Sequence, residues 1–334
     1  MSFLESMFYR VKHLAQGRYA GYLKIAVAVI PFVWIMYQID FSKLVVALRS
    51  TELWVFYSLA FFTIFLMFLQ GVKWWMLLRA FIPHLPLSEV LSCHFKGIYY
   101  SLFLPTSAAQ DVVRSVLLAQ KNDYGVTWGA TWLARISGLV VMLLLSFYGV
   151  ITIDPESAPD GMLVIIGSVC GLVIILGTMS FSKRLTRIFN RLLSNFLPGK
   201  IIGTIEHIRE GVYRYRSKKR CLINVMLLTL FIQTLFVVNA IFLIRGITGS
   251  FYVAECFAYV PLIELICLSV PLTPNGIGVR DGLSALMFRQ VGLSMEELGT
   301  YVLISLGAVI LKIVGGLPVL YEAVAKMIKK ERTG

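Results

Sequence analysis

The segment Ser269–Phe288, SVPLTPNGIGVRDGLSALMF, places two prolines, two glycines and a charged pair between long apolar runs. Pro271 and Pro274 disfavour a continuous helix, because proline has no backbone N–H and its ring collides with the preceding turn. From Val279 onward the residues again suit a short helix. The segment therefore predicts a broken helix, and its surroundings decide what the break means.

Those surroundings indicate a membrane protein. Of the 334 residues, 58% are hydrophobic and 15% are charged, with a mean hydropathy of +0.79, whereas soluble domains carry about 25% charged residues. A helix needs about 20 apolar residues to cross the hydrocarbon core. We therefore expect an all-α polytopic membrane protein with about seven full transmembrane helices. The expected spans are 21–39, 53–78, 128–153, 161–181, 222–244, 251–270 and 298–324.

The net charge of +13 is distributed unevenly. The segment 182–220 carries eleven Lys and Arg residues, the two chain ends are also basic, and the loop 154–160, DPESAPD, is acidic. Because basic loops stay cytoplasmic, we expect both termini and 182–220 inside and 154–160 outside. The basic segment has no aromatic-interleaved recognition motif, so we expect contact with anionic lipid headgroups and no nucleic acid. A topology signal alone is the other interpretation.

This charge pattern divides the chain into an interfacial N-terminal helix (1–20), one transmembrane domain (21–326) and a basic cytoplasmic tail (327–334). Within the domain, 182–220 is expected to be a basic cytoplasmic amphipathic segment. The first twenty residues lack the apolar core and small-residue cleavage site of a signal peptide. Lys73, Arg79 and the pair Trp74–Trp75 are expected to mark the inner membrane interface.

Two regions do not fit the pattern of full spans. About fifty residues between 78 and 128 must begin and end inside, and their apolar arms, Phe95–Leu104 and Val112–Ala119, are too short to cross. The arms meet at Pro105, so we expect a re-entrant hairpin. The region 251–290 must begin and end outside, and it breaks before a short helix at Val279–Val291. The two broken elements thus enter from opposite faces.

The two breaks are also similar to each other. FLPTSAAQDVVRSVLL and PLTPNGIGVRDGLSALM both place a proline and a small-residue turn before Val-Arg at the start of an apolar helix. A possible inverted repeat with discontinuous helices fits this pattern, with the helix N-termini directed at a site near the membrane midplane.

Such a site favours anion binding. Helix N-termini carry unpaired N–H groups and a partial positive charge, glycines let a ligand approach the backbone, and arginine forks suit phosphate. Charges within spans usually face a cavity or a partner. The expected substrate-binding residues are Asp111, Arg114, Arg135, Glu264, Asn275, Gly276, Gly278, Arg280, Asp281 and Lys312, with Pro105, Pro271 and Pro274 as the positions of the breaks.

Each charged candidate also has a structural interpretation. Asp111 and Arg114 are spaced i, i+3 and can pair on a helix surface. The pair Arg280–Asp281 can lie at the outer interface, outside any cavity. Arg135 can snorkel to the membrane interface or bond a carbonyl of a neighbouring helix, and Lys312 can pair with Glu264.

Other chemistry has little support in the sequence. The five cysteines are scattered without a CxxC spacing, and the four histidines form no metal-binding motif. No GxxxxGK[ST] phosphate-binding loop occurs. We therefore expect no metal, no cofactor and no catalytic constellation, and any transport is expected to be facilitated or coupled to an ion gradient.

Five stretches carry a resemblance to a known family: WWMLLRAF (74–81), LPTSAAQDVVRSVLL (104–118), ARISGLVVMLLL (134–145), PLTPNGIGVRDGLSALMF (271–288) and GGLPVLYE (315–322). Together they resemble the flippase-like transmembrane domain of the lysylphosphatidylglycerol synthase family, from about 24 to 326.

The match to the first family signature rests on Pro105, Asp111 and Arg114, and the match to the second on Pro274, Gly276, Gly278 and Arg280. The chain departs from the family pattern with Ser101 for Asn, with Thr106, Ser107 and Ala109 in the glycine-rich part of the first signature, with Ala134 for Glu and with Asp281 for Glu. The resemblance implies movement of an amphiphilic lipid across the bacterial inner membrane. The stretch after the last span is too short for the family's soluble aminoacyl-transferase domain.

Three function classes fit these observations. The first is a flippase or transporter for a phosphate-containing lipid, whether a phospholipid, an aminoacyl-phospholipid or a polyprenyl phosphate, with Asp111, Asp281 or Glu264 as groups that could couple an ion. The second is a membrane enzyme acting on a lipid-linked phosphate or sugar, with His94 or Asp111 as the base. The third is a lipid-binding partner of an envelope biosynthesis enzyme that docks through 182–220. The sequence leaves the lipid, the direction, the energy source and the oligomeric state open.

Overall fold

The computed structural model describes residues 46, 49, 51–104, 108–153, 164, 167, 168, 170, 171, 199–269 and 278–322. The regular elements within these ranges are all helices. Several predictions lie outside the described residues: the interfacial helix 1–20, the span 21–39, the loop 154–160, the tail 327–334 and most of the span 161–181.

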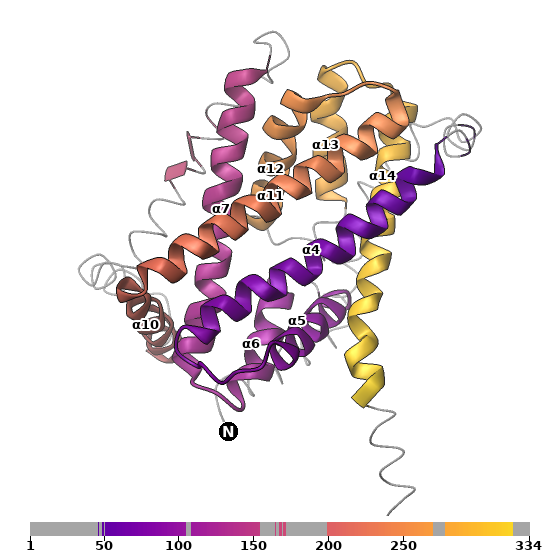
Figure 1. The fold of residues 1–334 in the computed structure, drawn as a ribbon. Coiled ribbons are helices and arrows are strands. Elements are labelled where there is room, and N and C mark those ends of the chain that lie inside the picture. Colours follow the sequence, from indigo (N-terminus) through magenta and orange to yellow (C-terminus); the bar gives the residue numbers. More distant parts are fainter. Residues whose placement is uncertain are drawn as a thin grey trace, which may run out of the picture.

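Among the described residues, four helices are long and apolar enough to cross a membrane. They are α4 (Leu53–Arg79), α7 (Tyr124–Thr152), α11 (Lys219–Thr248) and the segment Met295–Glu322, which begins with α14 (Met295–Leu311). All four were predicted as spans, at 53–78, 128–153, 222–244 and 298–324. Figure 1 shows α7 upright, with α4 and α11 crossing it obliquely.

The predicted span 251–270 contains a helix over nearly all of its described residues. Helix α12 (Val253–Ser269) has 17 residues and contains Pro261. At 1.5 Å per residue this described helix is about 26 Å long, against a hydrocarbon core of ~30 Å. The residues that follow Ser269 lie outside the described ones, so a full span here stays a prediction.

Two pairs of short helices correspond to the predicted broken elements. The first pair is α5 (Leu87–Ser101) and α6 (Ala109–Ala119), and the second is α12 with α13 (Val279–Gln290). In Figure 1 the first pair lies at the lower end of the molecule and the second toward the upper end. The connecting turns lie outside the described residues, together with Pro105, Pro271, Pro274, Asn275 and Gly276. A re-entrant path for either pair stays a prediction.

Helix α5 begins eight residues before the predicted arm. Its buried residues Val90, His94, Gly97 and Ile98 recur at spacings of three and four, so one helical face is already defined before Phe95. The prediction followed the apolar run and therefore missed the polar first turns.

A short 3₁₀ segment, η4 (Lys312–Gly316), interrupts the last span before the helix resumes to Glu322. Pro318 has no N–H to bond the Val314 carbonyl, which explains the loss of α-helical bonding here. A Cβ on Gly315 would lie 2.7 Å from the carbonyl oxygen of Phe95. Only glycine therefore lets η4 approach the backbone of α5.

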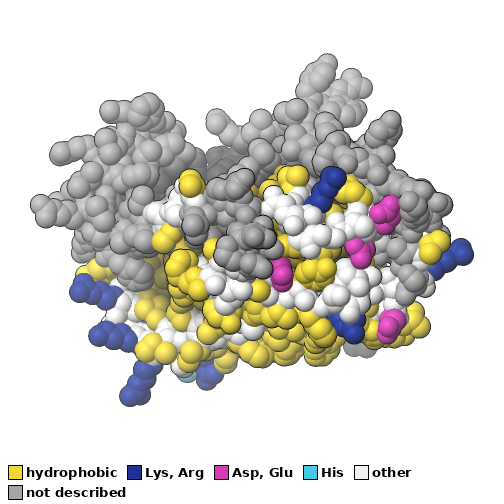
Figure 2. All heavy atoms as spheres, turned by 90° about the horizontal axis from the view of Figure 1, so that it is seen from above, with side chains coloured by type: hydrophobic (Ala, Val, Ile, Leu, Met, Phe, Trp, Pro, Cys, Tyr) yellow, Lys and Arg dark blue, Asp and Glu magenta, His cyan; other side chains and the backbone are white. Residues whose placement is uncertain are grey.

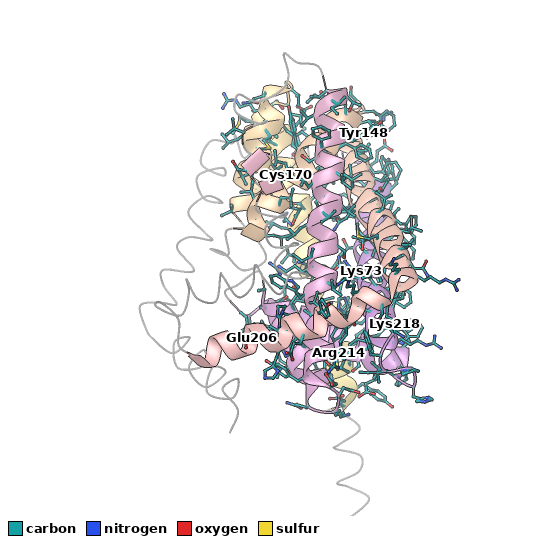
Figure 3. The ribbon with its side chains drawn as sticks, turned by 90° about the vertical axis from the view of Figure 1, so that its left-hand side faces the viewer. Lys73, Tyr148, Cys170, Glu206, Arg214 and Lys218 are labelled. Carbon is teal, nitrogen blue, oxygen red and sulfur yellow. The ribbon has the colours of Figure 1, made fainter. Side chains whose placement is uncertain are left out.

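Helix α10 (Gly199–Arg214) and the turn η2 (Tyr215–Ser217) represent the basic segment. Figure 3 shows α10, marked by Glu206 and Arg214, running across the lower end of α7. A Cβ on Gly129 of α7 would lie 2.8 Å from the carbonyl carbon of Gly211, so the two backbones are in contact. The buried Tyr215 hydroxyl donates to the Leu77 carbonyl at 2.9 Å and attaches this segment to α4.

The outer surface of the helices is largely apolar. On α4, Leu53, Tyr57 and Phe61 are between 61% and 72% exposed, whereas Val55 and Leu59 on the opposite face are buried against α11 and α14. Figure 2, which views the upper end of Figure 1, shows apolar side chains over much of the described surface and Lys and Arg at its edges. Such a surface suits contact with lipid chains.

The contact between α7 and α12 generates the first prediction. A Cβ at Gly149 would overlap the backbone of Phe257 and Ala258. We expect Gly149→Ala to destabilise the protein by roughly 1–3 kcal/mol, because overpacking forces the two helices apart. Thermal unfolding in detergent, followed by tryptophan fluorescence, measures the change. Gly282→Ala is the control, since nothing lies within 4 Å of its added Cβ; equal losses in both variants would contradict the close contact.

Candidate functional site

Asp111, in the first turn of α6, pairs with two arginines. Its Oδ1 lies 2.7 Å from Arg114 Nη2, and its Oδ2 lies 2.8 Å from Arg135 Nη1 on α7. The predicted i, i+3 pair is therefore present, and Arg135 binds the same carboxylate instead of snorkelling to the interface. One carboxylate thus joins three of the predicted site residues.

Arg114 is 5% exposed and also contacts α4 and α5. Its Nη1 lies 3.1 Å from His94 Nδ1, and its guanidinium carbon lies 4.7 Å from the centroid of the Trp74 ring. A guanidinium has only donors, so His94 Nδ1 must accept. The proton of His94 is then on Nε2, which donates to the Met67 carbonyl at 3.1 Å. His94 is therefore neutral, with both ring nitrogens engaged.

Lys73 and Trp74 were expected to mark the inner membrane interface, and both side chains are buried inside the protein; their level in the membrane stays a prediction. Lys73 Nζ donates to the Ala134 carbonyl at 3.0 Å, and Trp74 Nε1 donates to Thr131 Oγ1 at 3.0 Å. The face of α4 that carries them packs against α7, where polar partners are available. The sequence did contain a signal for these buried polar contacts, because Lys73 lies inside a predicted span.

We call Lys73, His94, Asp111, Arg114 and Arg135 the Asp111 group. With His94 neutral, three cations face one carboxylate, which leaves an excess of two positive charges. Lys73 and Arg114 are buried, whereas the side chains of Arg135 and Asp111 are 22% and 21% exposed. An anion would therefore meet Arg135 first. Figure 3 shows Lys73 between the level of Tyr148 and that of the basic residues Arg214 and Lys218.

A separate cavity lies among α11, α12, α13, α14 and Leu59 of α4. Its volume is about 60 Å³, enough for several water molecules. We call it the Glu264 cavity. Its polar lining consists of Asn239, Glu264, Arg280, Ser284, Tyr301 and Ser305. Asn239 and Tyr301 were not predicted, because neither belongs to a charge or a motif in the sequence.

Arg280 and Asp281 have different roles in this cavity. Asp281 is 1% exposed, and its Oδ2 accepts from the backbone N–H of Gly278 at 3.0 Å, which caps α13. Gly278 has φ 82°, a left-handed conformation that favours glycine. Arg280 Nε lies 3.6 Å from Asp281 Oδ1, while its buried Nη2 has no hydrogen-bond partner among the described residues. Arg280 thus lines the cavity with a donor available.

Lys312, in η4, interacts electrostatically with both Arg280 and Glu264. Arg280 and Lys312 together balance the charges of Glu264 and Asp281. This second group is therefore neutral overall, unlike the Asp111 group.

Comparisons with known proteins agree with the resemblance seen in the sequence. A family model described as the lysylphosphatidylglycerol synthase TM region matches residues 22–313. No curated protein and no solved structure matches the chain.

The Asp111 group generates the second prediction. We expect Asp111→Asn to destabilise the protein by about 3 kcal/mol, because it leaves Arg114 and Arg135 without their shared counter-charge. Glu89→Gln is the control, since Glu89 pairs at 3.6 Å with Lys121, whose side chain is 75% exposed, and such a surface pair contributes at most about 1 kcal/mol. Thermal unfolding in detergent compares the two. Equal stability of both variants would show that Asp111 does not hold the arginines.

Proposed function

Because the chain belongs to the family of lysylphosphatidylglycerol synthase transmembrane regions, we propose that it moves a phosphate-containing lipid between the two leaflets of the bacterial inner membrane. The headgroup phosphate binds in turn to arginines between the helices, while the acyl chains stay in the bilayer. The proposal is carried by the excess of two positive charges in the Asp111 group.

An unbalanced positive charge between apolar helices needs an anion. Charges at membrane depth cost at least ~2.5–3.5 kcal/mol each and usually face a partner or an aqueous cavity. Within the part of the chain that the structure describes, Arg114 Nε is buried without a hydrogen-bond partner. The ammonium group of Lys73 has three donors, of which one bonds to the Ala134 carbonyl. A phosphate has enough acceptor oxygens to satisfy several such donors.

The Glu264 cavity supplies a further arginine, Arg280, for the headgroup phosphate. Helices α6 and α13, which carry Arg114 and Arg280, belong to helix pairs at opposite ends of the molecule in Figure 1. A headgroup that passes between the leaflets would therefore meet Arg135 and Arg280 at different stages. Phospholipids, aminoacyl-phospholipids and polyprenyl phosphates share the phosphate that these residues would recognise.

The geometry favours transport over catalysis. Both nitrogens of His94 and both carboxylate oxygens of Asp111 are engaged, so neither side chain is ready to act as a general base. The partner-protein alternative depends on the basic segment, where Arg214, Arg216, Lys218, Lys219 and Arg220 are exposed.

The third prediction tests transport. Proteoliposomes of phosphatidylcholine and phosphatidylglycerol that contain NBD-labelled phosphatidylglycerol are treated with dithionite, which reduces probe in the outer leaflet. We expect wild type to expose the inner-leaflet probe, and Arg135→Gln and Arg280→Gln to slow this exposure roughly tenfold to hundredfold, because a hydrogen bond to a charged group contributes about 1.5–3 kcal/mol. Mass spectrometry of lipids bound to the purified protein identifies the native cargo.

Two variants control this assay. Arg289→Gln removes an exposed arginine at the end of α13, and Arg216→Gln removes one from the basic segment. Both are expected to transport like wild type. Arg216→Gln could instead be the only variant that loses activity in cells, while Arg135→Gln and Arg280→Gln keep it. That result would replace the transport proposal by the interpretation as a lipid-binding partner that docks through 182–220.

The fourth prediction concerns orientation. Ser217 and Ser250 are exposed beyond the two ends of α11, and the basic residues gather at the Ser217 end. Basic loops stay cytoplasmic. We therefore expect a membrane-impermeant maleimide to label Ser250→Cys in spheroplasts, which expose the outer face of the inner membrane. The same reagent should label Ser217→Cys in inverted membrane vesicles, which expose the cytoplasmic face. The reverse pattern would invert the proposed topology.

A further inference from the structure

The Glu264 cavity contains a carboxylate whose partner is not obvious. Three acidic residues lie in the two groups described above: Asp111, Glu264 and Asp281. Asp111 pairs with two arginines within 3 Å. Asp281 caps α13 and is fully enclosed. Glu264 lines the cavity, and within the described residues no ion pair within 4 Å engages it. It is therefore the carboxylate that is available to bind a proton.

The groups that face Glu264 come from every helix around the cavity. Helix α13 contributes Arg280 and Asp281, α14 contributes Tyr301, η4 contributes Lys312, and α12 itself contributes Cys267. Helix α11 contributes the uncharged Asn239. Helix α7 packs along α12 through Ser146, whose hydroxyl donates to the Ala258 carbonyl, and through Tyr148 against Phe257. Arg280 and Lys312 are the two cations among these groups, and both interact electrostatically with Glu264.

An anion on Arg280 would change that balance. Arg280 Nη2 is buried without a partner beside the cavity, so it is the donor that a phosphate oxygen would reach first. The four charges of Arg280, Lys312, Glu264 and Asp281 sum to zero. A bound phosphate monoanion would leave one net negative charge in a poorly solvated site, which is unfavourable. One proton on Glu264 restores neutrality.

We propose that the Glu264 cavity binds a phosphate-type anion and a proton together, the anion at Arg280 and the proton at Glu264. The carboxylate takes the proton from water as the anion arrives and returns it when the anion leaves, so no bond other than O–H forms or breaks. Because coupling of two binding events is reciprocal, a proton gradient would then drive the anion. The inference rests on the proposed lipid transport and adds its energy source.

The fifth prediction measures proton uptake on binding. Short-chain dioctanoyl-phosphatidylglycerol and glycerophosphoglycerol, the same phosphodiester headgroup without acyl chains, are titrated separately into the purified protein by calorimetry, in two buffers of different ionisation enthalpy. For wild type we expect the heats to differ by the amount for about one proton taken up per anion. Binding of the lipid alone identifies a membrane ligand, and equal binding of both probes identifies the free phosphate group as sufficient.

Matched variants locate the proton. Glu264→Gln is expected to bind the anion without any difference between the buffers, and Glu255→Gln, the same change on the same helix, is expected to behave like wild type. Glu264→Asp keeps a carboxylate and should keep proton uptake, which serves as the readout if the Gln variant does not fold. Binding without proton uptake by wild type, or uptake that persists in Glu264→Gln, would overturn the inference.

A measurement of transport distinguishes a failure of this inference from a failure of the proposed function on which it rests. In the liposome assay, wild type is expected to slow as the pH rises and protons become scarce, while the rate of Glu264→Gln does not change with pH. If wild type moves lipid at a rate that does not depend on pH, the coupled proton is contradicted but the proposed lipid transport is not. If neither probe binds and no lipid moves, the proposed function fails as well.

Discussion

The carboxylate of Asp111 holds two arginines from two helices, and the packing of the first helix pair depends on this interaction. The same arginine, Arg114, reaches His94 on α5, and Lys73 of α4 bonds to the backbone of α7. The Asp111–Arg114 pair lies within α6, whereas the other three bonds join α6 to α7, α6 to α5 and α4 to α7. Together they fix α4, α5, α6 and α7 relative to one another. Because removal of one partner would leave a buried charge, the network permits few alternative arrangements.

Between lipid-exposed helices the hydrophobic effect contributes little, since lipid tails are as apolar as the side chains. The fold instead uses polar bonds and very close backbone contacts. Gly129, Gly149 and Gly315 each lie where a Cβ would collide with a neighbouring backbone. The two means are complementary, because the glycines bring helices near enough for short polar side chains such as Ser146 to reach a carbonyl on the next helix.

Composition and hydropathy predicted the four long helices of the described part of the chain, because hydropathy is a local property. The prolines of the two expected breaks lie outside the described residues, so the exact position of each break stays a prediction. The pair Asp111–Arg114 was also predictable, because residues spaced i, i+3 are neighbours on the surface of a helix. The bonds from Arg135 to Asp111 and from Lys73 to Ala134 join residues 24 and 61 positions apart. They depend on how each helix is rotated about its axis, which apolar runs on all sides of a membrane helix do not specify. The cavity residues Asn239 and Tyr301 were missed for the same reason.

The 3₁₀ segment η4 gives the last span a second consequence. A 3₁₀-helix has 3.0 residues per turn and rises about 2.0 Å per residue, against 3.6 residues and 1.5 Å for an α-helix. Conversion of its five residues to α geometry would therefore shorten the span by about 2.5 Å and rotate its ends by about 100° relative to each other. Lys312 at one end interacts with the Glu264 cavity, and Glu322 beyond the other pairs with Lys96 on α5. Both contacts are present together in the structure, so the 3₁₀ geometry of this short segment sets the length and rotation at which the last span reaches both helix pairs at once.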